Sequence, residues 1–564
     1  MKKESKPRRD WSADLLLVGL TAACLLPFVG KAFNIDDPLF VWAAQHIRAH
    51  PLDPYGFDVN WYALSKPMWE VTKNPPLACY YIAFASRLVG WREAGMHAFF
   101  FVPAAAAVLG TYRLAARMCK NPVVAALACL LTPVFVVSST TVMCDVPMLA
   151  LWVWAVEFWI RGLDERRSWM NILSAVLVAA AALSKYYGMS LIPLLIVYTL
   201  VREKRLGSWA GCLLIPVAVL LWYQATTHSL YGRGLLTDAA SYASMSRFGR
   251  GAFVAQMLFV GLTFAGGCLA SALFYAPLIW RCKHLLAGIG LAAAVAVVLS
   301  RIGSVGRFSL AGTSGEPNWV VIGQMSVFAT VGLSLVALCV TDMLRRRDAD
   351  SALLATWVLG TLVFASLVNW SVNGRSILPA APAAAILIAR RLEVLQSAAS
   401  GRRSWRMMIP LIPAALLSMW VAYGDYAYAQ AQRTAAREVL ARYAGGDGIV
   451  FTEGHWGFQY YMRSGGAVDL DFAESRLSRG DVVAVPSNNA NLVKLPAQDF
   501  ERRDTIRVPI RSFMATQQPK MRAGFYADVF GPLPYAVGVV PDQRVDIYVA
   551  CKNLTIRQAK IYVQ

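Results

Sequence analysis

The stretch DLLLVGLTAACLLPFVGKAFNIDDPLFVWAAQHI, from Asp14 to Ile47, places an acidic pair directly after an apolar segment. That segment, from about Asp14 to Phe33, is long enough to cross a bilayer, which takes about 20 residues. Asp36 and Asp37 follow within a few residues of the hydrocarbon, where a carboxylate is costly and usually has a function. The pair is therefore a helix cap, a topology signal or part of a catalytic site.

The composition indicates a membrane protein that crosses the bilayer many times. Of the 564 residues, 57% are hydrophobic and only 16% are charged, whereas a soluble chain carries about 25% charged residues. The 18 Trp and 22 Tyr fit side chains that favour the membrane interface. The formal net charge of +20 would indicate nucleic acid in a soluble protein, so the position of the basic residues decides its meaning.

Basic residues gather in alternate loops, and this pattern predicts the topology. The flank MKKESKPRR before the first span predicts a cytoplasmic N-terminus, and no small-residue cleavage site follows, so the span is expected to be an anchor. If Pro75–Gly90 forms a helix on the outer face, the loops RLAARMCK, RGLDERRSW, REKR, RCKH and RRRD are all cytoplasmic. This interpretation gives about 13 spans. It also accounts for the positive charge, so no nucleic-acid partner is expected.

The chain is predicted to have two parts. Residues 1–424 form a transmembrane module, in which residues 34–95 are the first outer loop with interfacial helices. Residues 425–564 form an extracytoplasmic domain, because AQAQRTAAREVLARYAGG and HWGFQYYMRSGG indicate helices, and DGIVFTE, GDVVAVPS and RVDIYVACK indicate strands. The expected fold is a polytopic α-helical membrane protein with a small extracytoplasmic α/β domain.

Titratable residues recur at the outer ends of several spans. Each has a plain structural interpretation: Asp37 before Pro38 is a good helix start, and Asp145 in CDVP is another. Lys185 and Arg375 can extend to the outer surface along their aliphatic stems. Their convergence on one face favours a functional site at the boundary between membrane and water.

Five short motifs, in order from about residue 34 to 390, support a site there: DDPLFVWAAQHI, TKNPPLACYYIAF, CDVPMLALW, SKYYG and GRSILPAAP. Together they resemble the integral-membrane glycosyltransferases of GT-C type, specifically the protein-mannosyltransferase and lipid A aminoarabinose-transferase group. About 13 spans and an outer C-terminal domain also resemble the aminoarabinose transferase. The sequence departs from the family where Asp37 replaces a frequent Glu, and where Asn74 stands at the usual Lys, with Lys73 one residue earlier.

The resemblance implies transfer of a sugar from a polyprenyl-phosphate donor to an acceptor at the outer face, by a single displacement that inverts the anomeric carbon. Asp36 is the expected base, and Asp145 and Asp37 would orient the acceptor or the base. No metal site is predicted, although some relatives use a divalent cation. The expected contacts to the donor phosphate are Lys73, Asn74, Lys185 and Arg375.

The alternative is a transporter or flippase of lipid-linked sugars, which would more often place ionisable residues near the bilayer midplane. Here such residues are few within the spans, and the large outer loop and C-terminal domain favour chemistry at the surface. A third interpretation is a membrane-anchored receptor. A protein hydroxyl, lipid A, a glycan or another lipid would each serve as acceptor. The expected location is the bacterial inner membrane, with the site on the periplasmic side.

Overall fold

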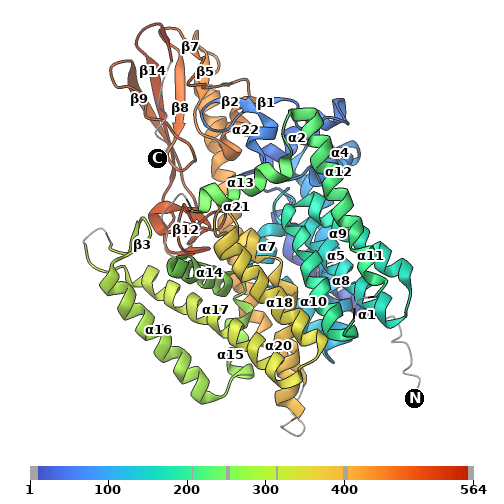
Figure 1. The fold of residues 1–564 in the computed structure, drawn as a ribbon. Coiled ribbons are helices and arrows are strands. Elements are labelled where there is room, and N and C mark those ends of the chain that lie inside the picture. The colour runs from blue at the N-terminus through green and yellow to red at the C-terminus, as the bar shows by residue number, and fades with distance from the viewer. Residues whose placement is uncertain (1–10, 206, 249–253, 313–314, 398–403, 557–564) are drawn as a thin grey trace.

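The computed structural model describes residues 11–205, 207–248, 254–312, 315–397 and 404–556. Helices make up most of these residues, and a five-stranded sheet lies at one end of the molecule (Figure 1). The predicted polytopic helical fold with a C-terminal α/β domain is therefore confirmed. The basic N-terminal flank lies outside the described residues.

Among the described residues, eight helical segments are long and apolar enough to cross a membrane, and two bent pairs raise the number to ten. The eight contain α1 (Trp11–Leu25), α5 (Glu93–Met118), α8 (Asp145–Asp164), α12 (Leu214–Tyr231), α16 (Cys282–Ile302), α17 (Trp319–Arg346), α18 (Ala349–Val363) and α21 (Leu411–Tyr443). The bent pairs are α6 (Pro122–Leu130) with α7 (Pro133–Ser139), at 63°, and α14 (Val254–Cys268) with α15 (Ser271–Ile279), at 83°.

The expected count of about 13 spans is not confirmed, because several predicted runs form shorter helices. At 1.5 Å per residue, a helix of 17 residues covers only about 26 Å, and the hydrocarbon core is about 30 Å thick. This limit applies to α9 (Ser168–Ser184) and more strongly to α10 (Leu191–Glu203) and α4 (Leu77–Val89). That α4 lies on the outer face stays a prediction.

The first outer loop is a compact structure of short elements. After α1 a 3₁₀ turn (Leu26–Phe28) leads to a loop that ends where α2 (Asp37–Ala49) begins. A hairpin of β1 (Asp58–Asn60) and β2 (Ser65–Pro67), then α3 (Met68–Val71) and α4, complete the loop. Helix α2 packs against α4 and against α22 (Trp456–Ser464) of the C-terminal domain, so the loop joins the two parts of the chain.

The C-terminal sheet has the strand order β6-β5-β8-β14-β9. Strand β5 is parallel to β6 and β8, whereas β14 is antiparallel to β8 and β9. The predicted strands at β5, β8 and β14 are confirmed, and the charged edge strand FERRDTIRV was not predicted. The bounds are β5 (Val450–Thr452), β6 (Val468–Asp469), β8 (Val482–Pro486), β9 (Phe500–Val508) and β14 (Gln543–Ala550).

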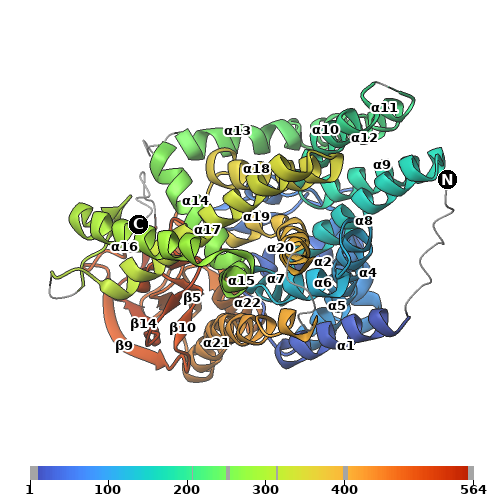
Figure 2. The same ribbon diagram turned by 90° about the horizontal axis from the view of Figure 1, so that it is seen from below.

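Residues 514–537, called the docking segment below, extend from this sheet onto the helices (Figures 1 and 2). The Tyr535 hydroxyl donates to the carbonyl of Gly267 in α14 at 3.0 Å, and the Gly374 amide donates to the carbonyl of Phe525 at 2.7 Å. The segment is stabilised by two small pairs, β10 (Met514–Ala515) with β13 (Ala536–Val537) and β11 (Gln517–Gln518) with β12 (Ala523–Gly524).

Helix α21 runs without interruption through residues 424 and 425, where the boundary between the two parts was predicted. It begins among the apolar helices and ends beside the sheet, where it contacts β9 and β14. The division of the chain at residue 424 stays a prediction, and one continuous helix connects the two parts.

Candidate functional site

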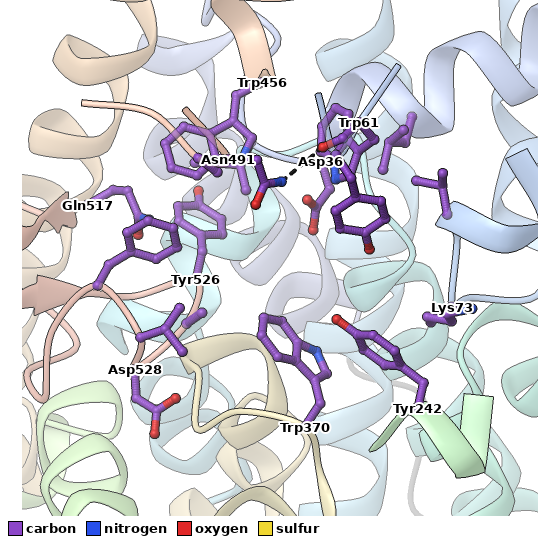
Figure 3. A pocket seen from close by; sticks show the side chains of 18 of the residues that line it. Asp36, Trp61, Lys73, Tyr242, Trp370, Trp456, Asn491, Gln517, Tyr526 and Asp528 are labelled. Carbon is purple, nitrogen blue, oxygen red and sulfur yellow. Dashed lines mark hydrogen bonds between the residues drawn. The ribbon is translucent and has the colours of Figure 1, made fainter. Parts of the chain in front are cut away.

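A cavity of about 710 Å³ lies between the helices and the C-terminal domain (Figure 3). This volume is in the range of roughly 300–1,000 Å³ that is usual for small-molecule sites. We call the lining residues before position 424 the N-terminal wall, and those after it the C-terminal wall. The N-terminal wall includes Asp36, Trp61, Lys73, Asn74, Tyr242 and Trp370, and the C-terminal wall includes Trp456, Asn491, Gln517, Tyr526 and Asp528.

Asp36 is the predicted base, and its carboxylate lies at the cavity. The preceding residue, Ile35, has a φ of 53°, a strained conformation for a β-branched side chain. Asp36 keeps 27% of its side chain exposed, and its Oδ2 lies 2.8 Å from Nη2 of Arg375. It is the residue before α2, yet its side chain makes no capping hydrogen bond. Helix capping therefore does not explain Asp36.

Arg375, in the short helix α19 (Gly374–Ile377), connects Asp36 to a second carboxylate. Its Nη1 lies 4.0 Å from Oδ2 of Asp145, whose Oδ1 accepts a hydrogen bond from Nζ of Lys185 at 2.6 Å. Asp145 is only 1% exposed and, like Asp36, is used for an ion pair rather than a cap. The four side chains form a line of alternating charge, called the charge array below: Asp36, Arg375, Asp145 and Lys185.

The charge array is electrically balanced, because two carboxylates face two cations. Burial alone would lower the pKa of Arg375, but the carboxylates of Asp36 and Asp145 raise it above its ordinary value. The guanidinium stays charged and also lies over the ring of Tyr526, 5.5 Å from its centre. Lys185 and Arg375 are therefore turned toward carboxylates, and extension to the outer surface does not explain them.

Asp37 has a different environment from its neighbour. It is completely buried, and its two oxygens accept backbone N–H bonds from Asn34 at 3.0 Å and Val142 at 2.8 Å. Burial raises its pKa to about 7, and the nearby Lys31 opposes that rise. Asp37 does not line the cavity. It fastens the turn that carries Asp36 to the loop before α8.

Lys73 and Asn74 line the cavity on the side of α13 (Leu235–Phe248). Nζ of Lys73 lies 2.5 Å from Oδ2 of Asp238 and 5.4 Å from the centre of the Tyr242 ring. The carbonyl of Asn74 accepts a hydrogen bond from Tyr55 at 2.9 Å, so this loop is held in place. Lys73 presents a cation to the cavity from the side opposite the docking segment (Figure 3).

The structure thus brings six of the seven predicted residues to one place in two layers. Asp36, Lys73 and Asn74 line the cavity, and Arg375, Asp145 and Lys185 continue behind Asp36. Asp37 lies apart as a buried structural residue. The described residues contain no group of three or more His, Cys, Asp or Glu side chains placed to hold a metal ion, and the absence of a metal stays a prediction.

A buried ion pair between Lys31 and Asp425 was not predicted. Lys31 follows the first span, and Asp425 lies in α21; both are 2% exposed. Asp425 also accepts hydrogen bonds from Thr516 at 2.7 Å and from Tyr526 at 2.8 Å. The pair therefore connects the first span, the last helix and the C-terminal wall. A lysine at the end of the first apolar run was the signal that could have drawn attention to it.

Comparison with known protein families gives one match within the chain. Residues 73–224 match the family model of dolichyl-phosphate-mannose-protein mannosyltransferases. The matched segment contains Lys73, Asn74, Asp145 and Lys185. The resemblance to the GT-C glycosyltransferases is confirmed over these residues. No curated protein sequence matches the chain.

Three solved structures resemble this chain, each with a TM-score below 0.5. The oligosaccharyltransferase of Archaeoglobus fulgidus in its apo form is 13% identical, with a TM-score of 0.48, over 83% of this chain and 65% of its own. This chain thus spans just under two thirds of that enzyme. ArnT from Cupriavidus metallidurans bound to undecaprenyl phosphate is 14% identical, with a TM-score of 0.42, over 85% of this chain and 93% of its own. Arabinofuranosyltransferase AftD from Mycobacteria is 13% identical, with a TM-score of 0.38, over 97% of this chain and 40% of its own.

Proposed function

We propose that this protein transfers a sugar from a polyprenyl-phosphate donor to an acceptor at the outer face of a membrane. The observation that carries the proposal is the charge array, which opens into a cavity at Asp36, the more exposed of its two carboxylates. The family match over residues 73–224 supports the reaction class. We place the protein in the bacterial inner membrane, with the cavity and the C-terminal domain on the periplasmic side.

Asp36 acts as the base. It takes the proton from an acceptor hydroxyl while that oxygen forms a bond to the anomeric carbon. The bond between the anomeric carbon and the phosphate oxygen breaks at the same time, and its electron pair leaves with the polyprenyl phosphate. A single displacement of this kind inverts the anomeric configuration.

Arg375 couples the two ends of this reaction through its charge. Before transfer its guanidinium pairs with the Asp36 carboxylate at 2.8 Å. When Asp36 accepts the proton it loses its negative charge, and the leaving phosphate gains one. The guanidinium is then free to stabilise the phosphate by a charge-assisted hydrogen bond. The negative charge that Asp36 loses is thus replaced by the one that the phosphate gains.

Lys73, Asn74 and Lys185 complete the donor site in this proposal. Lys73 approaches the cavity from the loop before α4, where its pairing with Asp238 leaves about a fifth of each side chain exposed. A phosphate can replace that carboxylate as the partner of Lys73. Lys185 holds Asp145 at 2.6 Å and so keeps Arg375 between its two carboxylates. Asp145 orients the array, and Asp37 fixes the backbone beneath it.

The test uses purified protein in nanodiscs with labelled lipid-linked sugars, extracted from cells that lack the protein, and a membrane extract of the same cells as acceptor. We expect release of polyprenyl phosphate and transfer of label to the acceptor without any gradient. A second measurement, in sealed vesicles, asks whether the donor crosses the membrane without being cleaved. Donor that crosses them with its glycosyl–phosphate bond intact would make the protein a transporter and overturn the proposal.

A further inference from the structure

The C-terminal wall of the cavity is built from parts of the chain that carry no family motif. Helix α22, the loop at Asn491 and the docking segment each supply side chains to it. In Figure 3 the labelled side chains of Trp456, Asn491, Gln517 and Tyr526 lie across the cavity from Lys73 and Tyr242. The proposed transfer step uses none of these residues of the C-terminal wall.

Trp456 stands in a strained conformation at the start of α22. Its φ of 62° is in the left-handed region, which a bulky side chain rarely adopts without a functional reason. The next residue, Gly457, donates its N–H to Oδ1 of Asn34 at 3.2 Å. A Cβ at Gly457 would lie 2.4 Å from the carbonyl oxygen of Phe33, so only glycine permits this close contact.

Two strained turns therefore meet at the cavity. One carries Ile35 and then Asp36, and the other carries Trp456; the Asn34 side chain joins them. Both Ile35 and Trp456 line the cavity. The contact fixes the backbone at Trp456 relative to the turn that carries Asp36, which is what a residue that positions a substrate at a base requires.

Gln517, in β11, gives the second and independent observation. It lines the cavity, its residue is only 2% exposed, and neither its amide nitrogen nor its amide oxygen has a hydrogen-bond partner among the described residues. A buried amide left in this state destabilises a fold. Its amide nitrogen needs an acceptor and its amide oxygen needs a donor, and a single hydroxyl can serve either atom.

This requirement restricts the chemistry of the ligand. A hydroxyl donates and accepts, whereas an ionised phosphate oxygen only accepts and an ammonium group only donates. The rings of Trp456, Tyr526 and Trp370 add flat apolar surfaces to the same cavity. A molecule that combines apolar ring faces with many hydroxyls, a saccharide, matches both features.

We infer that the C-terminal wall is the acceptor subsite and that the acceptor is a saccharide. Its ring packs on Trp456, its hydroxyls exchange hydrogen bonds with Gln517, and the hydroxyl to be glycosylated points to Asp36. The inference rests on the proposed function and adds the class of acceptor to it. Trp456 and Gln517 are specificity-determining residues here, and neither takes part in bond making.

The first test identifies the acceptor by its chemical sensitivity. The membrane extract is divided and treated beforehand with protease, with periodate, which cleaves vicinal diols of sugars, or with neither. We expect protease to leave the transfer of label unchanged and periodate to abolish it. Transfer that protease abolishes and periodate spares would overturn the inference while the proposed function stands. Absence of donor cleavage with the untreated extract would instead count against the proposed function, and the inference would fall with it.

The second test uses Gln517→Met, which removes the amide and nearly keeps the shape of the side chain. We expect the KM for the periodate-sensitive acceptor to rise about tenfold, the loss of one or two hydrogen bonds, with little change in kcat or in the KM for the donor. We also expect the melting temperature to stay equal or rise, since an unpaired polar group is removed. A purely structural role would lower it.

Trp456→Ala should raise the same acceptor KM, and Trp456→Phe should restore part of the affinity because it restores an aromatic face. The control for Gln517 is Gln518→Ala, a change in the same strand at a residue outside the cavity. Unchanged acceptor KM values in Gln517→Met and Trp456→Ala, with both proteins folded and active, would overturn the inference.

Discussion

The two walls of the cavity differ in the kind of side chain they present. Both walls contain aromatic rings, but the N-terminal wall also carries Asp36 and Lys73, whose charges are paired with neighbouring side chains, whereas the C-terminal wall carries the amide of Gln517, unpaired among the described residues, and the carboxylate of Asp528. Charged pairs can shift a proton and stabilise a leaving group, whereas rings and amides recognise shape and hydroxyl pattern. Under the two proposals above, this difference assigns catalysis and acceptor recognition to separate parts of the chain, so changes in the two walls should affect different kinetic constants.

The largest effect is expected from Asp36→Asn in the N-terminal wall. Loss of a positioned base costs about 100- to 10,000-fold in turnover, and Asn keeps the size of the side chain. We expect release of polyprenyl phosphate per mole of folded protein to fall by that factor. The acceptor KM should change little, which would sharpen the distinction between the walls.

The matched control for Asp36→Asn is Asp37→Asn, one residue away. It should keep most of the turnover in the fraction that folds, because Asp37 faces two backbone amides and not the cavity. Near-normal turnover of Asp36→Asn, or a selective loss of turnover in Asp37→Asn, would show that the base is assigned to the wrong carboxylate.

A second large effect, on the free energy of unfolding, is expected from the buried ion pair between Lys31 and Asp425. Lys31→Met leaves the Asp425 carboxylate buried without its cation, and removal of one partner of a buried pair costs about 3–5 kcal/mol. Denaturant unfolding in detergent measures this loss. The double variant Lys31→Met with Asp425→Asn should recover part of it. Equal free energies of unfolding for wild type and Lys31→Met would contradict the claim that this ion pair stabilises the contact between the two walls.

Intermediate effects are expected within the charge array. Lys185→Ala and Arg375→Ala each remove a charge-assisted contact of about 1.5–3 kcal/mol, seen as a higher donor KM or lower turnover. Independent phosphate contacts would give additive losses. Both cations, however, face Asp145, at 2.6 Å and 4.0 Å, and residues that share a partner are coupled by about 0.5–3 kcal/mol. A double variant whose loss equals the sum would show that the array does not act as a unit.

The last effect concerns the pH dependence of stability through Asp37. Its pKa is about 7 in the folded protein and 3.8 ordinarily, so the folded state binds this proton more tightly than the unfolded state does. Its contribution to stability is therefore full below about pH 4 and is lost as the pH rises to about 7. We expect the melting temperature of wild type, relative to that of Asp37→Asn, to fall over this interval. A constant difference would contradict the assignment.

The sequence predicted the N-terminal wall much better than the C-terminal wall, for a physical reason. Asp36, Lys73 and Asn74 each lie in a short motif beside an apolar run, so local pattern and the expected topology together place them on one face. Gln517 and Trp456 are brought together only by strand pairing and by the docking segment, which no local pattern encodes. The pairing of Lys31 with Asp425 spans 394 positions and was missed for the same reason.

Local pattern also failed to separate Asp36 from Asp37. An Asp before a Pro looks the same in sequence whether it caps a helix, bonds to a distant loop or faces a cavity. The distinction depends on partners far along the chain, Arg375 for the first residue and Val142 for the second. The number of spans was similarly uncertain, because an apolar run does not reveal where its helix bends or ends.

The contact between Lys31 and Asp425 has a consequence for how the protein is made. The ribosome synthesises Lys31 with the first span, nearly 400 residues before its partner. Until α21 follows, the lysine lacks its counterion and the C-terminal wall of the cavity does not exist. A chain truncated before residue 425 therefore lacks the acceptor subsite proposed above, although every residue of the proposed donor site is already synthesised.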